Sequence, residues 1–201
     1  MRVRSGRQEL SFSQYEDERR FNHECFTFYL NNYKKNATFA LSEFFSMKRQ
    51  RIYIDTSIVG GFFDRIFAIE TRDLFERLKN KEVIFVLSDV LKKELLNAPQ
   101  RVRDLLLQYE DDCFEHVELT KEAEFLANCY ISEKVVGPTS IDDCQHIAIA
   151  TINKVDVLAS WNFKHIVNLT RIKGYNSVNM KMGYSILEIR NPKELIDYGN
   201  D

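Results

Sequence analysis

Residues Arg51 to Ser57 read Arg-Ile-Tyr-Ile-Asp-Thr-Ser, a short apolar run that ends in a carboxylate and two hydroxyls. β-branched and aromatic residues are typical of a strand, and the Gly60–Gly61 pair that follows predicts a break. A strand made of Ile and Tyr gains no packing energy from a charge at its end. Asp55 is therefore a candidate functional residue as well as the end of a strand.

The pattern of short apolar runs separated by helical spacing continues to the end of the chain. A continuous apolar run such as 83–87 is typical of a strand covered on both faces. Strands that alternate with helices predict an α/β fold, a three-layer α/β/α sandwich with a mostly parallel central sheet. We expect strands over 51–55, 83–87, 115–119, 155–160 and 186–189, and helices over 70–78, from Ser88 or Asp89 to about Pro99, through 105–107, after Thr120, after Ser140 and after Pro192.

The composition supports a packed core and excludes several protein classes. The chain has 201 residues, of which 44% are hydrophobic and 29% charged, so a disordered or fibrous chain is excluded. Its apolar runs are too short to span a bilayer, and its N-terminus lacks the apolar region of a signal peptide. We therefore predict a cytoplasmic protein without a membrane segment. The net charge of −2 argues against a broad basic surface, so any contact with nucleic acid has to be local.

The cysteines and histidines do not form the pairs that zinc sites or redox motifs use. The four cysteines are widely spaced without a C-x-x-C pair, and the four histidines form no H-x-x-x-H pair. Neither a G-x-G-x-x-G nor a G-x-x-x-x-G-K-[ST] motif is present. Zinc, a disulfide framework and the common nucleotide sites are therefore disfavoured.

The chain changes character near Met47. Residues 1–46 hold ten of the 25 aromatic residues and no isoleucine, whereas the remaining residues hold sixteen isoleucines. We predict two parts, an aromatic-rich N-terminal extension (1–46) and the α/β domain (47–201). The extension is either a helical segment that packs on the domain or a leader or fused fragment added ahead of Met47.

Four polar positions are expected near the carboxyl ends of the strands, where ligands bind in sheets of this kind. They are Asp55, Glu94, the Asp142–Asp143 pair and Asn162. Each alone could cap a turn or complement a helix dipole, but several close carboxylates repel one another unless a cation is present. An all-oxygen cluster suits Mg²⁺ or Mn²⁺, which activate water and neutralise charge on a phosphoryl group. The residues therefore predict a metal-dependent phosphodiester hydrolase.

Residues 51–196 resemble a PIN-domain nuclease, the family that supplies the toxin subunits of VapBC-type toxin–antitoxin systems. The matching motifs are RIYIDTS (51–57), SDVLKKEL (88–95), DCQHIA (143–148) and SWNFKHI (160–166), in this order. The resemblance implies a VapC-type endoribonuclease toxin that hydrolyses RNA with Mg²⁺ or Mn²⁺. It also implies an antitoxin protein as a partner and a homodimer.

The resemblance assigns roles residue by residue. Asp55, Glu94 and Asp143 would hold the metal and form the catalytic centre, with Asp143 preferred because it precedes the His-Ile-Ala run. Ser57, Asp142 and Asn162 would support the metal or its water. Asn162 stands where many PIN domains have a fourth acid, which suggests one tightly held metal.

The groups expected to contact RNA are fewer. Lys164, His165, Arg171 and Lys173 follow Asn162 and could bind phosphates, or they could form a solvated face. The aromatic stretch 36–45 loosely resembles antitoxin tails, so the extension could bind the domain or a neighbouring copy. Because one acid is missing, the alternative function is a catalytically silent PIN-like module that binds RNA or protein.

Overall fold

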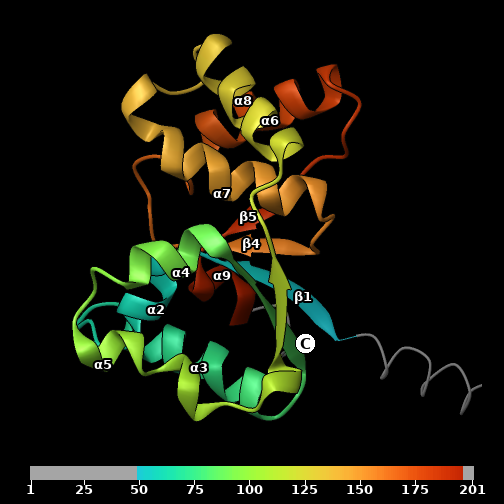
Figure 1. The fold of residues 1–201 in the computed structure, drawn as a ribbon. Helices are drawn as coiled ribbons and strands as arrows, with labels where there is room; N and C mark the ends of the chain where they lie inside the picture. Colours follow the sequence, from blue (N-terminus) through green and yellow to red (C-terminus); the bar gives the residue numbers. More distant parts are fainter. Residues whose placement is uncertain (1–48, 197–201) are drawn as a thin grey trace, which may run out of the picture. The chain divides into compact units, whose positions relative to one another are not determined.

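Five parallel strands form one sheet in the computed structural model, which describes residues 49–196 (Figure 1). The strand order is β3-β2-β1-β4-β5, and every pair of neighbours is parallel. The predicted α/β class with a mostly parallel sheet is confirmed. The strands are β1 (Gln50–Ile54), β2 (Val83–Ser88), β3 (Phe114–Val117), β4 (Val157–Ala159) and β5 (Ile189–Arg190).

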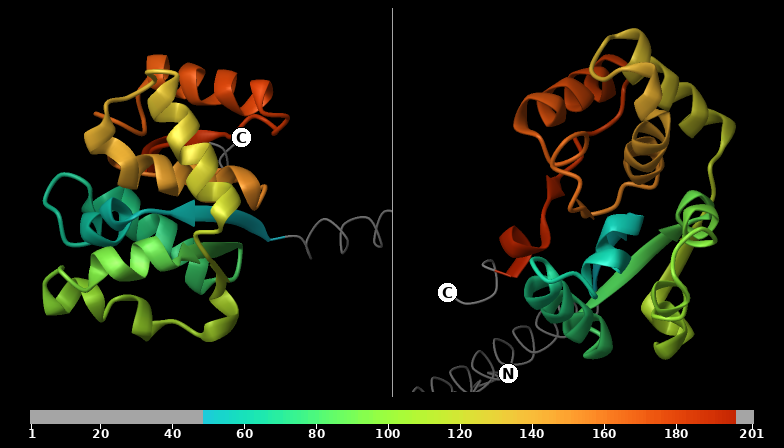
Figure 2. Two further views of the ribbon diagram at one scale, coloured as in Figure 1. Left: turned by 45° about the horizontal axis from the view of Figure 1, so that its top comes forward. Right: turned by 90° about the vertical axis from the view of Figure 1, so that its left-hand side faces the viewer.

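Helices cover both faces of this sheet, which gives the three predicted layers (Figures 1 and 2). One face carries α6 (Lys121–Ser132), α7 (Ile141–Ile152) and α8 (Leu169–Lys181). The opposite face carries α2 (Thr56–Gly61), α3 (Ala68–Lys79), α5 (Gln100–Arg103) and α9 (Pro192–Ile196). The helix α4 (Asp89–Leu95) contributes side chains to the core on both faces.

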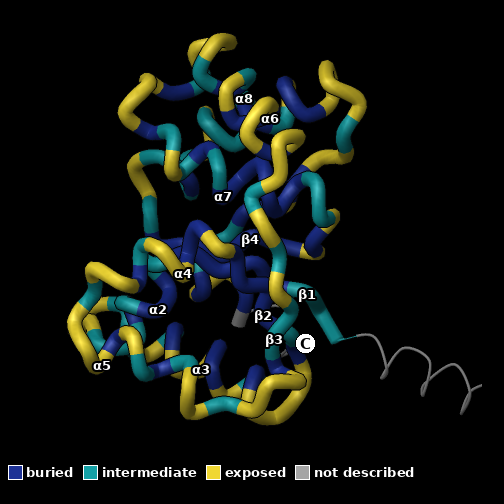
Figure 3. The backbone as a smooth tube through the Cα atoms, viewed as in Figure 1, coloured by how far each residue is buried: buried dark blue, intermediate teal, exposed yellow. Residues whose placement is uncertain are grey.

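The alternation of side chains in β1 divides the core into two halves. Ile52 and Ile54 pack with the α3 side, whereas Tyr53 between them packs with α6 and α7. All three side chains are fully buried, and Figure 3 shows that burial extends along the central strands. Successive residues of a strand point to opposite faces, so a strand between two helical layers has to be apolar on both. This explains why the central strands lack the polar alternation of a half-exposed sheet.

The strand order reverses beside the central strand β1. From β1 the chain builds outward through β2 and β3 and then returns to place β4 on the other side of β1. In the register, Ile54 at the end of β1 lies beside Ala159 at the end of β4. Ligands of open α/β sheets bind at such a reversal, outside the carboxyl ends of the strands. The residues that follow β1 and β4 therefore define where a site is expected.

Several predicted boundaries differ from the observed ones. The first strand ends at Ile54, and the predicted break after it is the short helix α2. The helix predicted through 105–107 is the short helix α5 followed by a 3₁₀ turn at Leu106–Gln108. The strand predicted over 83–87 is one residue longer, and the other three are shifted or shortened by one to three residues at their ends.

The helix α8 was not predicted at all. Only Tyr175, Val178 and Asn179 of its thirteen residues are buried, so its apolar stripe is too thin to stand out. Gly174 further weakens the helical signal. This glycine has a packing reason, because a Cβ atom there would lie 2.7 Å from Val135 Cγ1.

The predicted extension (1–46), including the antitoxin-like stretch 36–45, lies outside the described residues. The division into 1–46 and 47–201 therefore stays a prediction. Among residues 49–196, each helix is too short or too polar to cross a membrane.

Candidate active site

Asp55 lies directly after β1 and begins the helix α2. Its Oδ1 accepts hydrogen bonds from the backbone N–H of Ile58 (3.2 Å) and from Ser57 Oγ (2.5 Å). Its Oδ2 accepts a hydrogen bond from Ser160 Oγ (2.6 Å), which lies directly after β4. The side chain is almost completely buried, and this burial raises the pKa of Asp55 despite the opposing effects of these donors and of His146. A carboxylate is thus held at the strand reversal at an electrostatic cost.

Glu94 reaches the same place from α4, whose N-terminus is capped by the Ser88 side chain. Its Oε2 accepts a hydrogen bond from Thr56 Oγ1 and lies 3.2 Å from Nε2 of His146. Burial raises the pKa of Glu94, but the His146 imidazole and the Thr56 hydroxyl outweigh burial and lower the pKa overall. Glu94 is therefore the most readily ionised of the three predicted ligands.

Asp143 lies in the first turn of α7, and its Oδ1 accepts a hydrogen bond from Asn162 Nδ2 at 2.8 Å. Burial raises the pKa of this carboxyl, and the electrostatic interaction with His165 opposes that rise. Repulsion from Asp55 and Glu94 raises the pKa further. Asp143 is thus near enough to each of the other two predicted carboxylates to be repelled by them.

The predicted supporting residues have distinct surroundings. Ser57 Oγ bridges Asp55 and the backbone N–H of Trp161, which donates to it at 2.8 Å. Asn162 donates its amide to Asp143, while its Oδ1 accepts from the backbone N–H of His165 at 3.0 Å. Its amide oxygen is therefore already engaged within the chain. The Asp142 side chain is exposed and forms no hydrogen bond with residues 49–196.

Two hydroxyl residues at the site were missed by the sequence interpretation. Ser160 donates to Asp55, and Thr56 donates to Glu94. Both follow the last residue of a strand by one or two positions, at the two strands that flank the reversal. Position after a strand end was the signal used for Asp55, and it could have found these residues as well.

The donor set fits a hard divalent cation, although its arrangement is not a ready-made coordination sphere. Carboxylate oxygens are the ligands that Mg²⁺ and Mn²⁺ prefer, and Asp143 Oδ2 and Glu94 Oε1 accept no hydrogen bond from residues 49–196. Within the same residues, however, no three His, Cys, Asp or Glu side chains are grouped as a metal ion requires. Hydroxyls, an amide and the His146 ring contact the remaining carboxylate oxygens. A bound cation would have to replace some of those donors.

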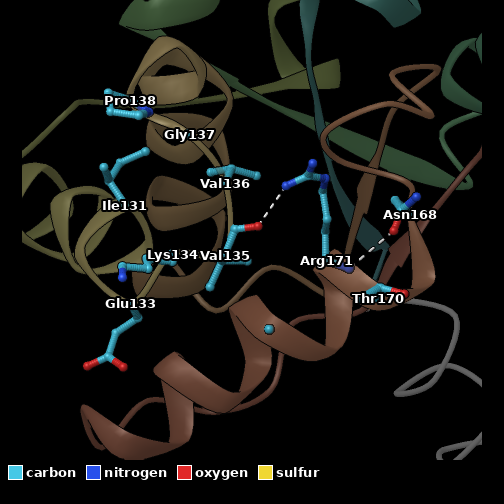
Figure 4. Close-up of a pocket in the computed structure, with 11 residues that line it drawn as sticks. Ile131, Glu133, Lys134, Val135, Val136, Gly137, Pro138, Asn168, Thr170 and Arg171 are labelled. Atoms are coloured by element: carbon cyan, nitrogen blue, oxygen red, sulfur yellow. Dashed lines mark hydrogen bonds between the residues drawn. The ribbon is translucent and has the colours of Figure 1, made fainter.

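Arg171, a predicted RNA contact, lines a pocket of about 920 Å³ between the loop after α6 and the first turns of α8 (Figure 4). Its Nη1 donates to the carbonyl of Val135 at 2.6 Å, and its Nε donates to the carbonyl of Lys164 at 3.1 Å. The guanidinium therefore ties three segments together. Lys164 and Lys173 are exposed, and His165 is half-buried with Nδ1 3.3 Å from Ser140 Oγ.

Trp161, the residue between Ser160 and Asn162, belongs to the core. Its indole stacks on Phe67 with ring centroids 4.4 Å apart, and its Nε1 donates to Thr71 Oγ1 at 2.9 Å. Only 9% of the side chain is exposed, so the face of the indole is covered and cannot stack on a base. Its neighbour Phe163 is about half exposed and tilts against the indole.

No family model matches the sequence, and no curated protein matches it. Several solved structures are similar to the chain, including the following two. One is VapBC2 from Rickettsia felis bound to a DNA fragment from their promoter, with 14% identity, a TM-score of 0.45, and 71% of this chain and 98% of that chain covered. The other is FitAB bound to the IR36 DNA fragment, with 13% identity, a TM-score of 0.46, and 70% of this chain and 94% of that chain covered.

Proposed function

We propose that the chain is a metal-dependent endoribonuclease that hydrolyses RNA phosphodiester bonds with Mg²⁺ or Mn²⁺. One observation carries the proposal: Asp55, Glu94 and Asp143 come from separate elements, and Asp143 is near enough to the other two carboxylates for both to raise its pKa. Buried carboxylates with raised pKa values are costly to a fold and cluster at functional sites. The resemblance of the strand-end motifs to PIN-domain nucleases supports the same assignment.

We assign a separate role to each group of residues at the site. Asp55, Glu94 and Asp143 would hold the cation, which when bound supplies an activated water and stabilises the departing oxygen. Ser57 and Ser160 keep Asp55 oriented through both of its oxygens. Asn162 does the same for Asp143, and exposed cations such as Lys164 would bind the RNA backbone.

The biological role that we propose is that of a VapC-type toxin in the cytoplasm, with an antitoxin protein as its partner and a homodimer as its working form. This rests on the motif resemblance in the sequence. Co-purification with a protein encoded beside it, and a solution mass of twice the chain, are the expected observations.

The test is cleavage of a panel of structured and single-stranded RNAs by the purified full chain with Mg²⁺, with Mn²⁺ and with EDTA. We expect cleavage that needs a metal and is lost in Asp55→Asn. Asp73→Asn is the matched control, because Asp73 is exposed on α3, away from the strand ends. Cleavage that survives both EDTA and Asp55→Asn would contradict the proposal.

The second candidate function is a silent module that binds RNA or protein. It is favoured by the hydroxyls and the Asn162 amide, which already occupy carboxylate oxygens. RNA binding without cleavage, together with no measurable Mn²⁺ binding, would establish this alternative.

A further inference from the structure

A fully buried tyrosine lies behind the carboxylates, on the central strand β1. The hydroxyl of Tyr53 donates to Ser88 Oγ at 2.8 Å and lies 2.7 Å from Nδ1 of His146. Ser88 Oγ in turn accepts the backbone N–H of Leu91 at 3.1 Å and caps α4. One phenol oxygen therefore contacts both the start of the helix that carries Glu94 and the helix that carries Asp143.

His146 connects this hydroxyl to Glu94. The imidazole is 3% exposed, and its other nitrogen, Nε2, lies 3.2 Å from Glu94 Oε2. The ring also packs edge-on against the ring of Tyr53, with centroids 5.7 Å apart. Because both ring nitrogens are engaged, the imidazole cannot rotate without losing a hydrogen bond at each end.

Glu94 needs such support more than Asp55 does. It has one more rotatable bond than an aspartate, and a third of its side chain is exposed, so water competes for its oxygens. Asp55 is held through both oxygens by residues beside it, whereas Glu94 is held only through Oε2. Its orientation therefore depends on whether the His146 ring stays in place.

We propose that Tyr53 is a positioning residue that fixes the His146 ring and thereby orients Glu94 toward the cation site. This inference rests on the proposed function, because the cation is the one proposed to bind there. Residues that orient a ligand side chain from behind typically change metal affinity by about 10- to 100-fold. Tyr53 carries no ligand atom itself, so its effect has to pass through His146 and Ser88.

The chain offers a matched control for a purely structural effect. Tyr130 is also fully buried, and its hydroxyl donates to Asn179 Oδ1 at 2.5 Å, within the core of α6 and α8. Tyr130→Phe and Tyr53→Phe each remove one buried hydroxyl that forms hydrogen bonds. If Tyr53 served stability alone, the two variants should have the same affinity for Mn²⁺.

The experiment uses the full chain without RNA and measures Mn²⁺ affinity by the loss of the free-ion signal in electron paramagnetic resonance. We expect about 10-fold or weaker Mn²⁺ binding for Tyr53→Phe and a change of less than about twofold for Tyr130→Phe. His146→Gln, which keeps an amide N–H near the position of Nε2, should bind Mn²⁺ more tightly than His146→Leu. Equal affinity of the wild-type chain and Tyr53→Phe would overturn the inference.

A second measurement separates this inference from the proposed function. The ¹⁵N chemical shifts of the His146 ring, recorded without metal, should move in Tyr53→Phe and stay in place in Tyr130→Phe. Unmoved shifts in Tyr53→Phe overturn the inference whatever the affinity. Failure of the wild-type chain to bind Mn²⁺ at all overturns the proposed function, while shifts that move still support the Tyr53–His146 contact.

Discussion

The carboxylate site and the pocket beside Arg171 are both polar, but charged groups have opposite effects on stability in the two regions. At the site, Asp55 is buried and Asp143 is half-buried, both have raised pKa values, and the charge of Asp55 contributes to the rise at Asp143. At the pocket, the guanidinium of Arg171 donates to the carbonyls of Val135 and Lys164. The first region holds charge at a cost to the fold, and the second uses charge to hold segments together.

This contrast separates polar residues that stabilise the fold from polar residues kept for chemistry. A residue that serves the fold should destabilise the protein when it is replaced. A residue kept for function often stabilises the protein when it is replaced, because the fold no longer bears its cost. Stability and activity should therefore change in opposite directions at the site and in the same direction at the pocket.

The largest effect is expected for Asp143→Asn, where RNA cleavage should fall by at least about 10²-fold. The metal-free protein should nevertheless become more stable, by a few tenths to about 1 kcal/mol, because a half-buried repelled charge is removed. The Oδ1 that accepts from Asn162 is kept in the variant. Cleavage assays and thermal unfolding in EDTA measure the two changes.

The stability that Asp143→Asn adds should depend on pH in one direction. The pKa of Asp143 is raised in the folded state, so the wild-type chain loses stability as pH rises above the ordinary value of 3.8. The stability difference between Asp143→Asn and the wild-type chain should therefore be small in acid and grow toward neutral pH. A difference that shrinks with rising pH would contradict the assignment of an unfavourable charge.

Gly61→Ala should destabilise the protein by about 1–3 kcal/mol, the usual cost of overpacking. A Cβ atom there would lie 2.8 Å from two atoms of the Trp161 indole, which is fixed by its hydrogen bond to Thr71. Gly174→Ala, at the pocket, should cost less, because its close contact is a methyl group of the half-buried Val135. Urea unfolding of both variants measures the two losses of stability. A larger loss for Gly174→Ala than for Gly61→Ala would contradict this prediction.

Arg171→Met should destabilise the protein by about 1 kcal/mol, because the partly buried carbonyl of Val135 and the exposed carbonyl of Lys164 lose a charged donor. Lys173→Met, an exposed neighbour on α8, should leave stability within about 0.5 kcal/mol of the wild-type chain. Chemical unfolding checks both. Unchanged stability in Arg171→Met would show that the pocket does not use this charge structurally.

The smallest effect is expected for the double variant Lys164→Ala and Lys173→Ala. These exposed cations should bind RNA phosphates only weakly, so affinity should fall a few-fold with stability unchanged. The dependence of the logarithm of affinity on that of salt concentration should flatten by roughly 0.7 for each phosphate that the variant no longer binds. Titrations at several salt concentrations, with an Asp143→Asn background to prevent cleavage, make this measurement. A weakening that does not depend on salt would argue against binding to phosphates.

The sequence predicted the parts of the fold that a single strong pattern determines. The apolar runs of β1 and β2 are buried on both faces and stood out, whereas α8 buries only three residues and was missed. At the candidate site, Asp55 stood out because a charge follows an apolar strand. Tyr53 could not stand out, because an aromatic residue in a strand is ordinary until its hydroxyl is seen beside His146.

The roles of Arg171 and Asn162 could not be read from the sequence for a related reason. Their partners are a carbonyl 36 residues away for Arg171 and a carboxylate 19 residues away for Asn162. Every residue has a backbone carbonyl, so the sequence does not show which carbonyl an arginine binds, or whether it contacts a substrate instead. For Arg171, the packing of α8 against the loop after α6 shows that it binds carbonyls.

The position of Trp161 gives the molecule an optical reporter of its own. It is the only tryptophan in the chain, so all indole emission comes from one place. Its backbone N–H is bonded to Ser57 Oγ, which is bonded to Asp55, so a rearrangement at that carboxylate is two hydrogen bonds away from the fluorophore. Occupancy of the site could then be followed in the unlabelled protein through the wavelength and intensity of its emission.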